Sequence, residues 1–262
     1  MSVRREWPAP LPQLLATLLL LVLAVVVLAG RKPDDSLPRV QQAGELVAAM
    51  DASYPPFEMT DGQGNFGGFD ADVAREIARR LGVGVRFANI AFDSLYDALA
   101  SRTADVVISG LRFERERTRD VIYTPSYADV GQVLVVRAAD AATTADLAGR
   151  SVAVETASEG EVEGSKLAAK VAGMRIREYE TPEEMAAALH SQEVDAAVAD
   201  LVTARDMAKG QPGLRLLLPP FAPDPLVIAG DSRDRALMTE INRILKAMRD
   251  EGVLDRLAEK WF

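Results

Sequence analysis

The sequence predicts an α/β fold built from two similar lobes, and three observations support this prediction. Short β-like runs alternate with helical stretches after residue 39, in two successive series, which favours parallel sheets covered by helices. A Leu-x-Ser-x-x-x-Asp pattern that begins at Leu99 recurs 90 residues later at Leu189, within the same order of elements. The 262 residues, 48% apolar and 26% charged, are ordinary globular material with room for two small domains.

Residues 1–30 predict export. Arg4 and Arg5 precede an uncharged apolar run at 14–29 that ends in small or tolerated residues, a layout typical of a signal peptide. An uncleaved anchor helix is the alternative, although the run is slightly short for a membrane span. Because the basic side stays in the cytoplasm, we expect the remainder in the periplasm or on the outer face of the cytoplasmic membrane. The absence of cysteine excludes a lipid anchor on that residue.

Residues 31–39 are polar and contain proline, and we interpret them as a linker. In the first series we expect strands at 46–50, 85–90 and 105–109 and helices at 72–81 and 94–101. In the second series we expect strands at 151–154, 174–179 and 195–199 and helices at 162–171 and 182–191. Amphipathic helices at 237–249 and 254–262 end the chain.

Composition excludes several classes of function. A net charge of -9 argues against nucleic acid as a partner, because phosphate binding requires a basic surface. With no cysteine and His190 as the single histidine, thiol catalysis, a Ser-His triad and a Cys or His metal site have almost no residues available. We therefore predict no cofactor and no metal.

Two short motifs do not change this prediction. Residues 62–67 spell G-x-G-x-x-G, but no buried strand precedes them and no helix follows directly, so a nucleotide site is not expected. Residues 61–72 fit a calcium loop poorly, because Phe66 stands where the sharp turn needs glycine. A hairpin turn around Asp61 and Gly62 explains the glycines better.

Polar residues or glycine stand at the ends of four predicted strands. Asp51 and Ser109-Gly110 follow strands of the first series, and Glu155 and Asp200 follow strands of the second. Ligands of open α/β sheets bind beyond the carboxyl ends of the strands. If the two lobes face each other, these positions line one cleft.

Such a cleft suits a ligand with charges of both signs. The Arg117 guanidinium could bind a carboxylate through two parallel hydrogen bonds, and Asp200 could receive an ammonium group. Tyr54 and Phe92 could provide flat apolar walls. Each residue also has a structural alternative: a solvated charge run for Arg117, a helix cap for Asp200, a turn for Asp51, and the core for both aromatic residues.

Several segments, in order, carry a family resemblance. They are Asp-Ala-Ser-Tyr-Pro-Pro-Phe-Glu at 51–58, Gly-Phe-Asp-Ala-Asp-Val-Ala at 68–74, Asp-Val-Val-Ile-Ser-Gly at 105–110, Leu-Ala-Gly-Arg-Ser-Val-Ala-Val at 147–154, Val-Asp-Ala-Ala-Val-Ala-Asp at 194–200 and Lys-Trp-Phe at 260–262. Together they resemble the bacterial extracellular solute-binding proteins of family 3, which serve amino-acid ABC transporters.

The resemblance implies the two-lobed clamp of type II periplasmic binding proteins. Its lobes would be mostly parallel sheets flanked by helices, joined by two crossing strands near 130–135 and 223–228. Lobe one would comprise 40–129 plus 228–262, and lobe two 130–227. A ligand that touches both lobes would favour a closed state.

The resemblance also implies roles for individual residues. Arg117 would bind the ligand α-carboxylate, assisted by the backbone near Ser109 and Gly110, and Asp200 would bind the α-ammonium. Two aromatic residues, Tyr54 and Phe92, would sandwich the ligand side chain. Asp51 would contact the polar end of that side chain.

Three further candidates depart from the family pattern. Arg112 stands where members usually carry Thr or Ser, and residues 156–160 replace a Gly-Thr-Thr-like turn. Glu155 stands where some members carry a basic or neutral residue. Arg112 and Glu155 could pair across the cleft, or Arg112 could add a second anion site. We expect both, and Ser158 of the altered turn, to contact the ligand.

We therefore expect a monomeric, non-enzymatic binding protein that captures an amino acid or similar small zwitterion and delivers it to the permease of an ABC transporter. One alternative is an enzyme resembling cyclohexadienyl dehydratase, with Glu155 or Asp51 as the acid or base. The other is a membrane-tethered sensor.

Overall fold

The computed structural model describes residues 15–20, 34–140, 143–209, 211 and 213–262. The chain divides into two units, residues 1–35 and residues 36–262, each with more contacts inside it than to the other. Residues 15–20 are helical, and the remainder of the predicted signal or anchor segment lies outside the described residues. In the described ranges, no helix combines the length and apolar character that crossing a membrane requires.

Helix α2 (Ser36–Ala43) begins inside the segment that was predicted to be a linker, so residues 36–39 are helical rather than irregular. Tertiary contacts explain this difference. The Ser36 side-chain oxygen accepts a hydrogen bond from the Leu237 N–H at 3.1 Å, and Val40 is buried in the core. The polar residues of this segment therefore start the first lobe.

The first sheet contains five strands in the order β5-β1-β6-β15-β7. Their bounds are β1 Glu45–Met50, β5 Gly84–Asn89, β6 Val106–Val107, β7 Val121–Tyr123 and β15 Ala229–Asp231. Strand β1 pairs in parallel with β5 and β6, and β15 runs antiparallel to β6 and β7. The three predicted strands are confirmed, and the third is shorter than expected. Their parallel pairing confirms the predicted α/β class.

Helices cover this sheet on both faces. They are α3 Phe69–Leu81, α4 Leu95–Ala100, α8 Arg235–Asp250 and α9 Val253–Trp261. Alternate residues of β1 enter two separate cores: Leu46 and Ala48 pack in one, Val47 and Ala49 in the other. Burial on both faces explains why β1 is an unbroken apolar run rather than an alternating one.

The second sheet repeats this arrangement in the order β11-β10-β12-β9-β13. Its strands are β9 Gln132–Arg137, β10 Ser151–Glu155, β11 Arg175–Tyr179, β12 Ala196–Asp200 and β13 Leu214–Ala222, and its helices are α5 Glu159–Ala168, α6 Pro182–His190 and α7 Leu201–Ala208. Strand β10 pairs in parallel with β11 and β12. Helix α5 begins three residues before its predicted start, because Ser158 caps it by accepting a hydrogen bond from Glu161 N–H.

The internal repeat is visible in hydrogen bonds as well as in sequence. The Asp105 carboxylate accepts a hydrogen bond from Val47 N–H at 2.9 Å, and Asp195 accepts one from Ser151 N–H at 2.9 Å. Each aspartate thus ties the start of its strand to the neighbouring parallel strand, β1 or β10. A left-handed residue stands three positions before each aspartate, with φ 59° at Arg102 and φ 62° at Gln192. The two lobes therefore share local geometry.

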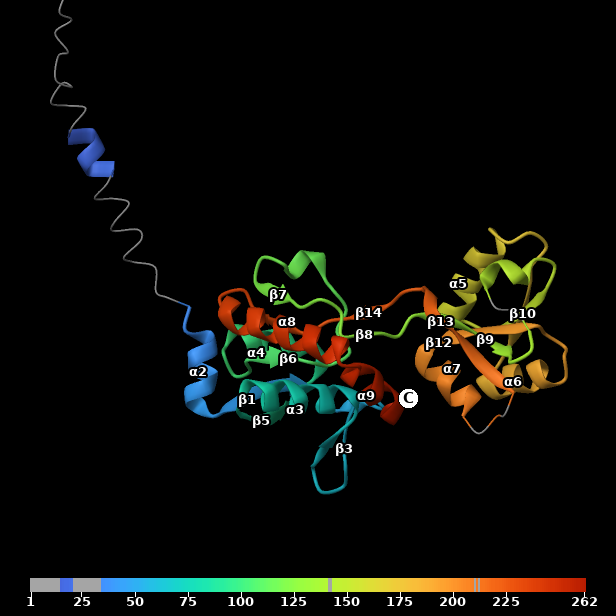
Figure 1. Ribbon diagram of the computed structural model, residues 1–262, viewed down its shortest axis with the longest axis horizontal. Coiled ribbons are helices and arrows are strands. Elements are labelled where there is room, and N and C mark those ends of the chain that lie inside the picture. The colour runs from blue at the N-terminus through green and yellow to red at the C-terminus, as the bar shows by residue number, and fades with distance from the viewer. Residues whose placement is uncertain (1–14, 21–33, 141–142, 210, 212) are drawn as a thin grey trace, which may run out of the picture. The chain divides into compact units, whose positions relative to one another are not determined.

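Two short strands connect the lobes: β8 (Ala128–Asp129) pairs antiparallel with β14 (Pro225–Leu226) (Figure 1). The first crossing was predicted at 130–135, but residues 132–137 form β9 inside the second sheet. Asp129 secures the connection, because its Oδ1 accepts hydrogen bonds from Gly131 N–H at 3.0 Å and Asp224 N–H at 2.9 Å. Both crossing segments are therefore fixed to one carboxylate.

A small sheet of β2 (Ser53–Tyr54), β3 (Glu58–Thr60) and β4 (Phe66–Gly67) extends from the first lobe. The turn between β3 and β4 is held by Asp61, whose Oδ1 accepts hydrogen bonds from the N–H groups of Gln63 and Asn65. This confirms the predicted hairpin around Asp61 and Gly62.

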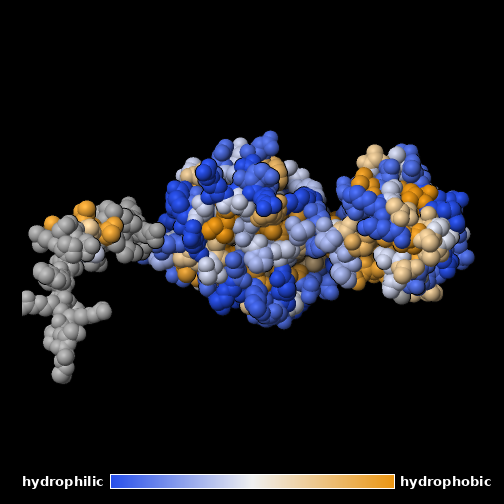
Figure 2. Space-filling view, turned by 90° about the horizontal axis from the view of Figure 1, so that it is seen from above, coloured by the Kyte–Doolittle hydropathy of each residue, from blue (hydrophilic) through white to orange (hydrophobic). Residues whose placement is uncertain are grey.

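Each lobe has its own apolar interior. The buried clusters that contain Leu46 and Val47 belong to the first sheet, and those that contain Val133 and Leu134 belong to the second. Hydrophilic residues cover most of the face visible in Figure 2. Each sheet thus has buried apolar packing of its own, away from the polar residues at the strand ends.

Candidate functional site

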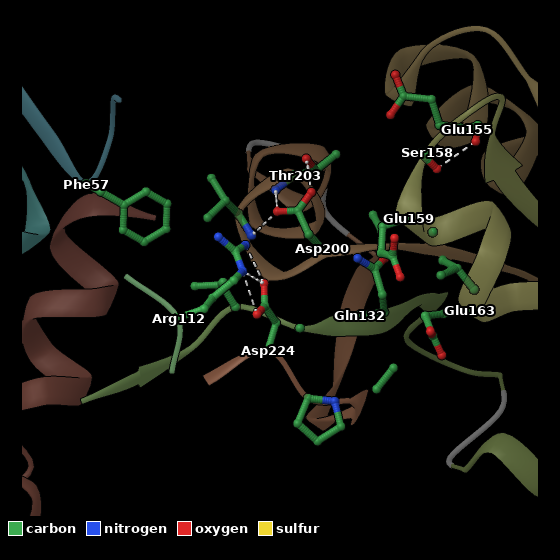
Figure 3. Close-up of a pocket in the computed structure, with 18 of the residues that line it drawn as sticks. Phe57, Arg112, Gln132, Glu155, Ser158, Glu159, Glu163, Asp200, Thr203 and Asp224 are labelled. Carbon is green, nitrogen blue, oxygen red and sulfur yellow. Dashed lines mark hydrogen bonds and ion pairs between the residues drawn. The ribbon is translucent and has the colours of Figure 1, made fainter. Parts of the chain in front are cut away.

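A cavity of about 640 Å³ is lined by residues of both lobes, and we call it the interlobe pocket (Figure 3). The first lobe contributes residues 54–57 and Arg112. The second lobe contributes the ends of β10 and β12 and the first turns of α5 and α7, and the connecting stretch 222–224 completes the lining. The carboxyl ends of β10 and β12 open into the pocket, as expected for an α/β sheet.

Half of the predicted ligand-binding residues line the interlobe pocket, namely Tyr54, Arg112, Glu155, Ser158 and Asp200. The residues that line it do not include the other five, which are Asp51, Phe92, Ser109, Gly110 and Arg117. For all ten, contact with a ligand stays a prediction.

Asp200 both caps a helix and faces the pocket. Its Oδ1 accepts hydrogen bonds from the N–H groups of Val202 at 2.9 Å and Thr203 at 3.1 Å, and its Oδ2 accepts one from the Thr203 hydroxyl at 2.6 Å. Three donors hold the carboxylate in one orientation (Figure 3). The cap and the pocket role, which were alternatives in the sequence, are compatible in the structure.

The wall formed by α5 is acidic. Glu155, Glu159 and Glu163 are spaced by four residues and line the pocket together (Figure 3). Only Glu155, the last residue of β10, was predicted from the sequence, although the four-residue spacing of Glu159 and Glu163 along α5 was a usable signal for those two. The pocket lining, as far as it is described, has five carboxylates, adding Asp200 and Asp224 to these three, against one guanidinium, that of Arg112.

Arg112 forms a bidentate ion pair with Asp224. The Arg112 Nε lies 2.8 Å from Asp224 Oδ1, and the Arg112 guanidinium lies 2.5 Å from Oδ2. These hydrogen bonds raise the pKa of Arg112 above its ordinary value. The residues are 112 positions apart, so no local pattern could have predicted the pair, and Glu155 is not the partner of Arg112 in this structure.

Arg117 contacts other residues of the first lobe and does not line the pocket. It lies in a short 3₁₀ helix, Arg115–Arg117, and its Nε donates a hydrogen bond to Glu114 at 2.7 Å. Its guanidinium also lies over the ring of Tyr96, 3.9 Å from the centroid. The structure therefore satisfies this cation without a ligand.

Asp51 acts in a turn in this structure. Its Oδ1 accepts a hydrogen bond from the Ser53 hydroxyl at 2.7 Å, and its Oδ2 accepts one from Phe92 N–H at 2.9 Å. Its own N–H donates to the Ser109 hydroxyl at 3.0 Å. Three of the predicted residues are thereby joined in one local network.

Tyr54 presents a flat ring at the edge of the pocket. The ring is stacked on Phe57, with centroids 5.1 Å apart and planes 10° from parallel. The side chain is 50% exposed, so one face is available to a ligand. The ring also borders Gly110, because a Cβ added at Gly110 would lie 3.5 Å from two ring carbons of Tyr54.

A buried acid pair beneath Ser109 and Gly110 was not predicted from the sequence. Ser109 donates a hydrogen bond to Glu58 Oε1 at 2.8 Å, and Asp70 accepts hydrogen bonds from Gly110 N–H and the Tyr127 hydroxyl, both at 2.7 Å. Burial and the nearby Asp70 raise the pKa of Glu58 to about 10. With a pKa near 10, Glu58 is protonated at neutral pH, beside the buried Asp70 carboxylate that helps to raise its pKa.

We expect this pair to make stability depend on pH. Because the folded pKa of Glu58 is raised to about 10 from 4.5, the folded protein keeps a proton that the unfolded chain loses above about pH 4.5. The free energy of unfolding should therefore fall as pH rises from about 4.5 to about 10, by at most about 1.4 kcal/mol per pH unit.

Urea unfolding at pH 7.5 and 9 would measure this decline in the original protein and in Glu58→Gln, which keeps a donor for Asp70 but does not titrate. The decline should be smaller in Glu58→Gln. Glu240→Gln, at an exposed pair with Arg243, is the control and should behave as the original protein does. An equal decline in all three proteins would show that Glu58 is ionised in the folded state.

No group of three or more His, Asp or Glu residues in the described ranges is arranged to hold a metal ion. What the geometry offers is a preformed carboxylate, an acidic helix face, a flat aromatic ring and one guanidinium around a cavity of small-molecule size. Two sheets flanked by helices, with a pocket lined by both lobes, define the fold of type II periplasmic amino-acid-binding proteins.

The chain belongs to the bacterial extracellular solute-binding proteins, family 3, whose profile matches residues 46–262. It is 27% identical over 254 residues to a probable amino-acid ABC transporter-binding protein of Haemophilus influenzae, covering 95% of this chain and 97% of that one. It is 28% identical over 223 residues to the arginine-binding extracellular protein ArtP of Bacillus subtilis, covering 83% and 86%.

Among solved structures, an ancestral cyclohexadienyl dehydratase matches with a TM-score of 0.74 and 27% identity, covering 86% of this chain and 95% of that one. The family predicted from the sequence motifs is confirmed. The relatives from H. influenzae and B. subtilis are binding proteins, whereas this structural relative is an ancestral enzyme.

Proposed function

We propose that this protein captures an amino acid with a cationic side chain in the interlobe pocket and delivers it to the permease of an ABC transporter. The observation that carries the proposal is the pocket charge: five carboxylates and one guanidinium, which Asp224 already neutralises. A cationic ligand relieves the repulsion between these carboxylates, whereas an acidic ligand adds to it. The arginine-binding relative supports this ligand class.

Each charged group of the ligand has a receptor. The α-ammonium binds Asp200, whose orientation is fixed before the ligand arrives by Val202 and Thr203. The side-chain cation binds the acidic face of α5, where Glu159 and Glu163 lie. The ligand stem packs on Tyr54. A guanidinium of the first lobe, Arg112 or Arg117, binds the carboxylate.

The class of protein supports the transport role. The protein is exported by its N-terminal segment, acts as a monomer in the periplasm or at the outer face of the cytoplasmic membrane, and catalyses no reaction. A ligand that contacts both lobes favours the closed state, and the permease recognises that state. The relative of H. influenzae supports an ABC transporter as the partner.

A dehydratase is the second candidate, and the similarity to the ancestral enzyme favours it. Dehydration of a cyclic carboxylate needs one acid or base in the cleft. Of the two residues considered, Glu155 lines the pocket, whereas Asp51 does not, and its two oxygens accept hydrogen bonds from Ser53 and Phe92. An enzyme would therefore use Glu155.

A thermal-shift screen of residues 31–262 tests both functions. The panel contains the common amino acids, dicarboxylates, polyamines and prephenate. L-arginine or L-lysine at about a thousandfold its dissociation constant should add about 4 kcal/mol to the free energy of unfolding, whereas L-glutamate should add nothing. A shift with no amino acid, or with L-glutamate alone, would contradict the proposal. Binding of prephenate alone, followed by loss of water and CO2 and the appearance of an aromatic product, would establish the dehydratase.

A further inference from the structure

The interlobe pocket contains a guanidinium that is already bound to a carboxylate of the same chain. Arg112 is held in the wall of the first lobe by its backbone, which forms an isolated bridge with Leu226. Its side chain binds both oxygens of Asp224, through Nε and a terminal nitrogen (Figure 3). This is the geometry with which arginine binds a free carboxylate.

Both members of the pair are accessible. The side chain of Arg112 is 56% exposed and that of Asp224 is 34% exposed. If a ligand carboxylate replaced Asp224, the released side chain could turn into water, and no unpaired charge would remain buried. Exchange of one carboxylate for another at Arg112 therefore has no large desolvation cost.

Asp224 also belongs to the connection between the lobes. Its N–H donates to Asp129 Oδ1 at 2.9 Å, and its carbonyl accepts a hydrogen bond from Val130 N–H at 3.1 Å. The ion pair therefore joins Arg112, in the first-lobe lining of the pocket, to the crossing segment that contains Asp224. Breaking it changes a contact at the place about which the lobes would turn.

The alternative guanidinium lacks these properties. Arg117 donates to Glu114 and covers Tyr96, and it is not among the residues that line the pocket. Arg112 is the one cation in the described lining, so an incoming carboxylate, repelled by the acidic wall, is attracted to Arg112.

We propose that Arg112 is the receptor for the carboxylate of the ligand, and that Asp224 occupies this receptor in the ligand-free protein as an internal competitor. The proposal rests on the proposed function, since it concerns the same pocket and an amino-acid ligand. On binding, the ligand carboxylate replaces that of Asp224 at Arg112, and the crossing segment loses its ion pair with the first lobe.

Calorimetric titration with L-arginine and with agmatine, which lacks the carboxylate, tests this proposal. Arg112→Met should weaken L-arginine binding by about 30-fold or more and leave agmatine binding nearly unchanged, because hydrogen bonds between charged groups are lost for one ligand only. Arg112→Lys should recover part of the affinity, since it keeps the charge without the two parallel hydrogen bonds. Arg117→Met should have a much smaller effect.

Asp224→Asn should tighten L-arginine binding by about fivefold, because it removes the charge that competes for Arg112. Glu163→Gln is the comparison: it also removes one carboxylate from the pocket, but one that is paired with Lys166 and assigned to the ligand side-chain cation, so it should weaken binding rather than tighten it. Urea unfolding of each variant would confirm that the fold is intact.

The outcomes separate the two proposals. If the original protein binds no amino acid of the panel, the proposed function fails, and this inference fails with it. If L-arginine or another amino acid binds and Arg112→Met does not weaken it, only the Arg112 assignment is overturned. A large loss in Arg117→Met instead would assign the carboxylate to Arg117. Unchanged or weaker binding in Asp224→Asn would refute the competitor role.

Discussion

Asp200→Asn is expected to weaken amino-acid binding by about 100-fold or more while leaving the free energy of unfolding nearly unchanged. The carboxylate lies in the pocket lining and is oriented by Val202 and Thr203, so an α-ammonium group would meet a fixed negative charge. Removal of one member of such a charged pair costs about 2–5 kcal/mol. Asparagine caps helices about as well as aspartate, so α7 should keep its start.

Asp200→Ala is the matched comparison, because it removes both the charge and the cap. It should bind as weakly as Asp200→Asn and should also lose about 0.5–2 kcal/mol of stability. Calorimetric titration with L-arginine and urea unfolding would measure the two effects separately. Normal binding in Asp200→Asn would show that Asp200 serves the helix alone.

Gly68→Ala is expected to destabilise the first lobe by about 4 kcal/mol or more, or to prevent folding. Gly68 precedes α3 with φ 114° and ψ 169°, a backbone region that essentially only glycine enters. A Cβ at this position would overlap the carbonyl oxygen of Phe57. The neighbouring N–H groups of Phe69 and Asp70 donate to the backbone of residues 56–57, so the contact cannot open without losing them.

Gly82→Ala provides the control. Gly82 also has a positive φ, 77°, but a Cβ there would meet no atom within 4 Å. It should cost about 1–2 kcal/mol, the usual penalty for a left-handed alanine. Urea unfolding compares the two variants, and circular dichroism would detect a variant that does not fold. Equal losses in both would show that backbone conformation matters at Gly68 and the contact with Phe57 does not.

The positions of Asp200 and Arg112 in the pocket suggest how one amino acid would be captured between the lobes. Asp200 is fixed on the second lobe and Arg112 on the first, so a single amino acid would join the lobes through opposite ends. An internal carboxylate at Arg112 would keep the ligand-free pocket from holding other anions, because any anion must compete with Asp224. Selectivity would then arise partly from repulsion by the acidic wall and partly from this competition.

The order of strands and helices could be predicted from the sequence because it depends on local pattern. Buried parallel strands such as 46–50 are continuous apolar runs, and helices such as 72–81 show a 3.6-residue period. The repeat at Leu99 and Leu189 was predicted for the same reason, and the hydrogen bonds of Asp105 and Asp195 now explain it. Polar residues at strand ends placed Glu155 and Asp200 at the pocket, since a parallel sheet brings those ends together.

Only the tertiary structure revealed which charges meet. Arg112 and Asp224 are 112 positions apart, and their pairing depends on where the crossing strands β8 and β14 return to the first lobe. Glu58 and Asp70 raise each other's electrostatic cost because both are buried under one turn, an arrangement that no periodicity encodes. The sequence resemblance assigned the ligand carboxylate to Arg117, and only the structure shows that Arg112 lines the pocket whereas Arg117 does not. Secondary structure follows from contacts within a few residues, whereas a charged site depends on the folding together of distant segments.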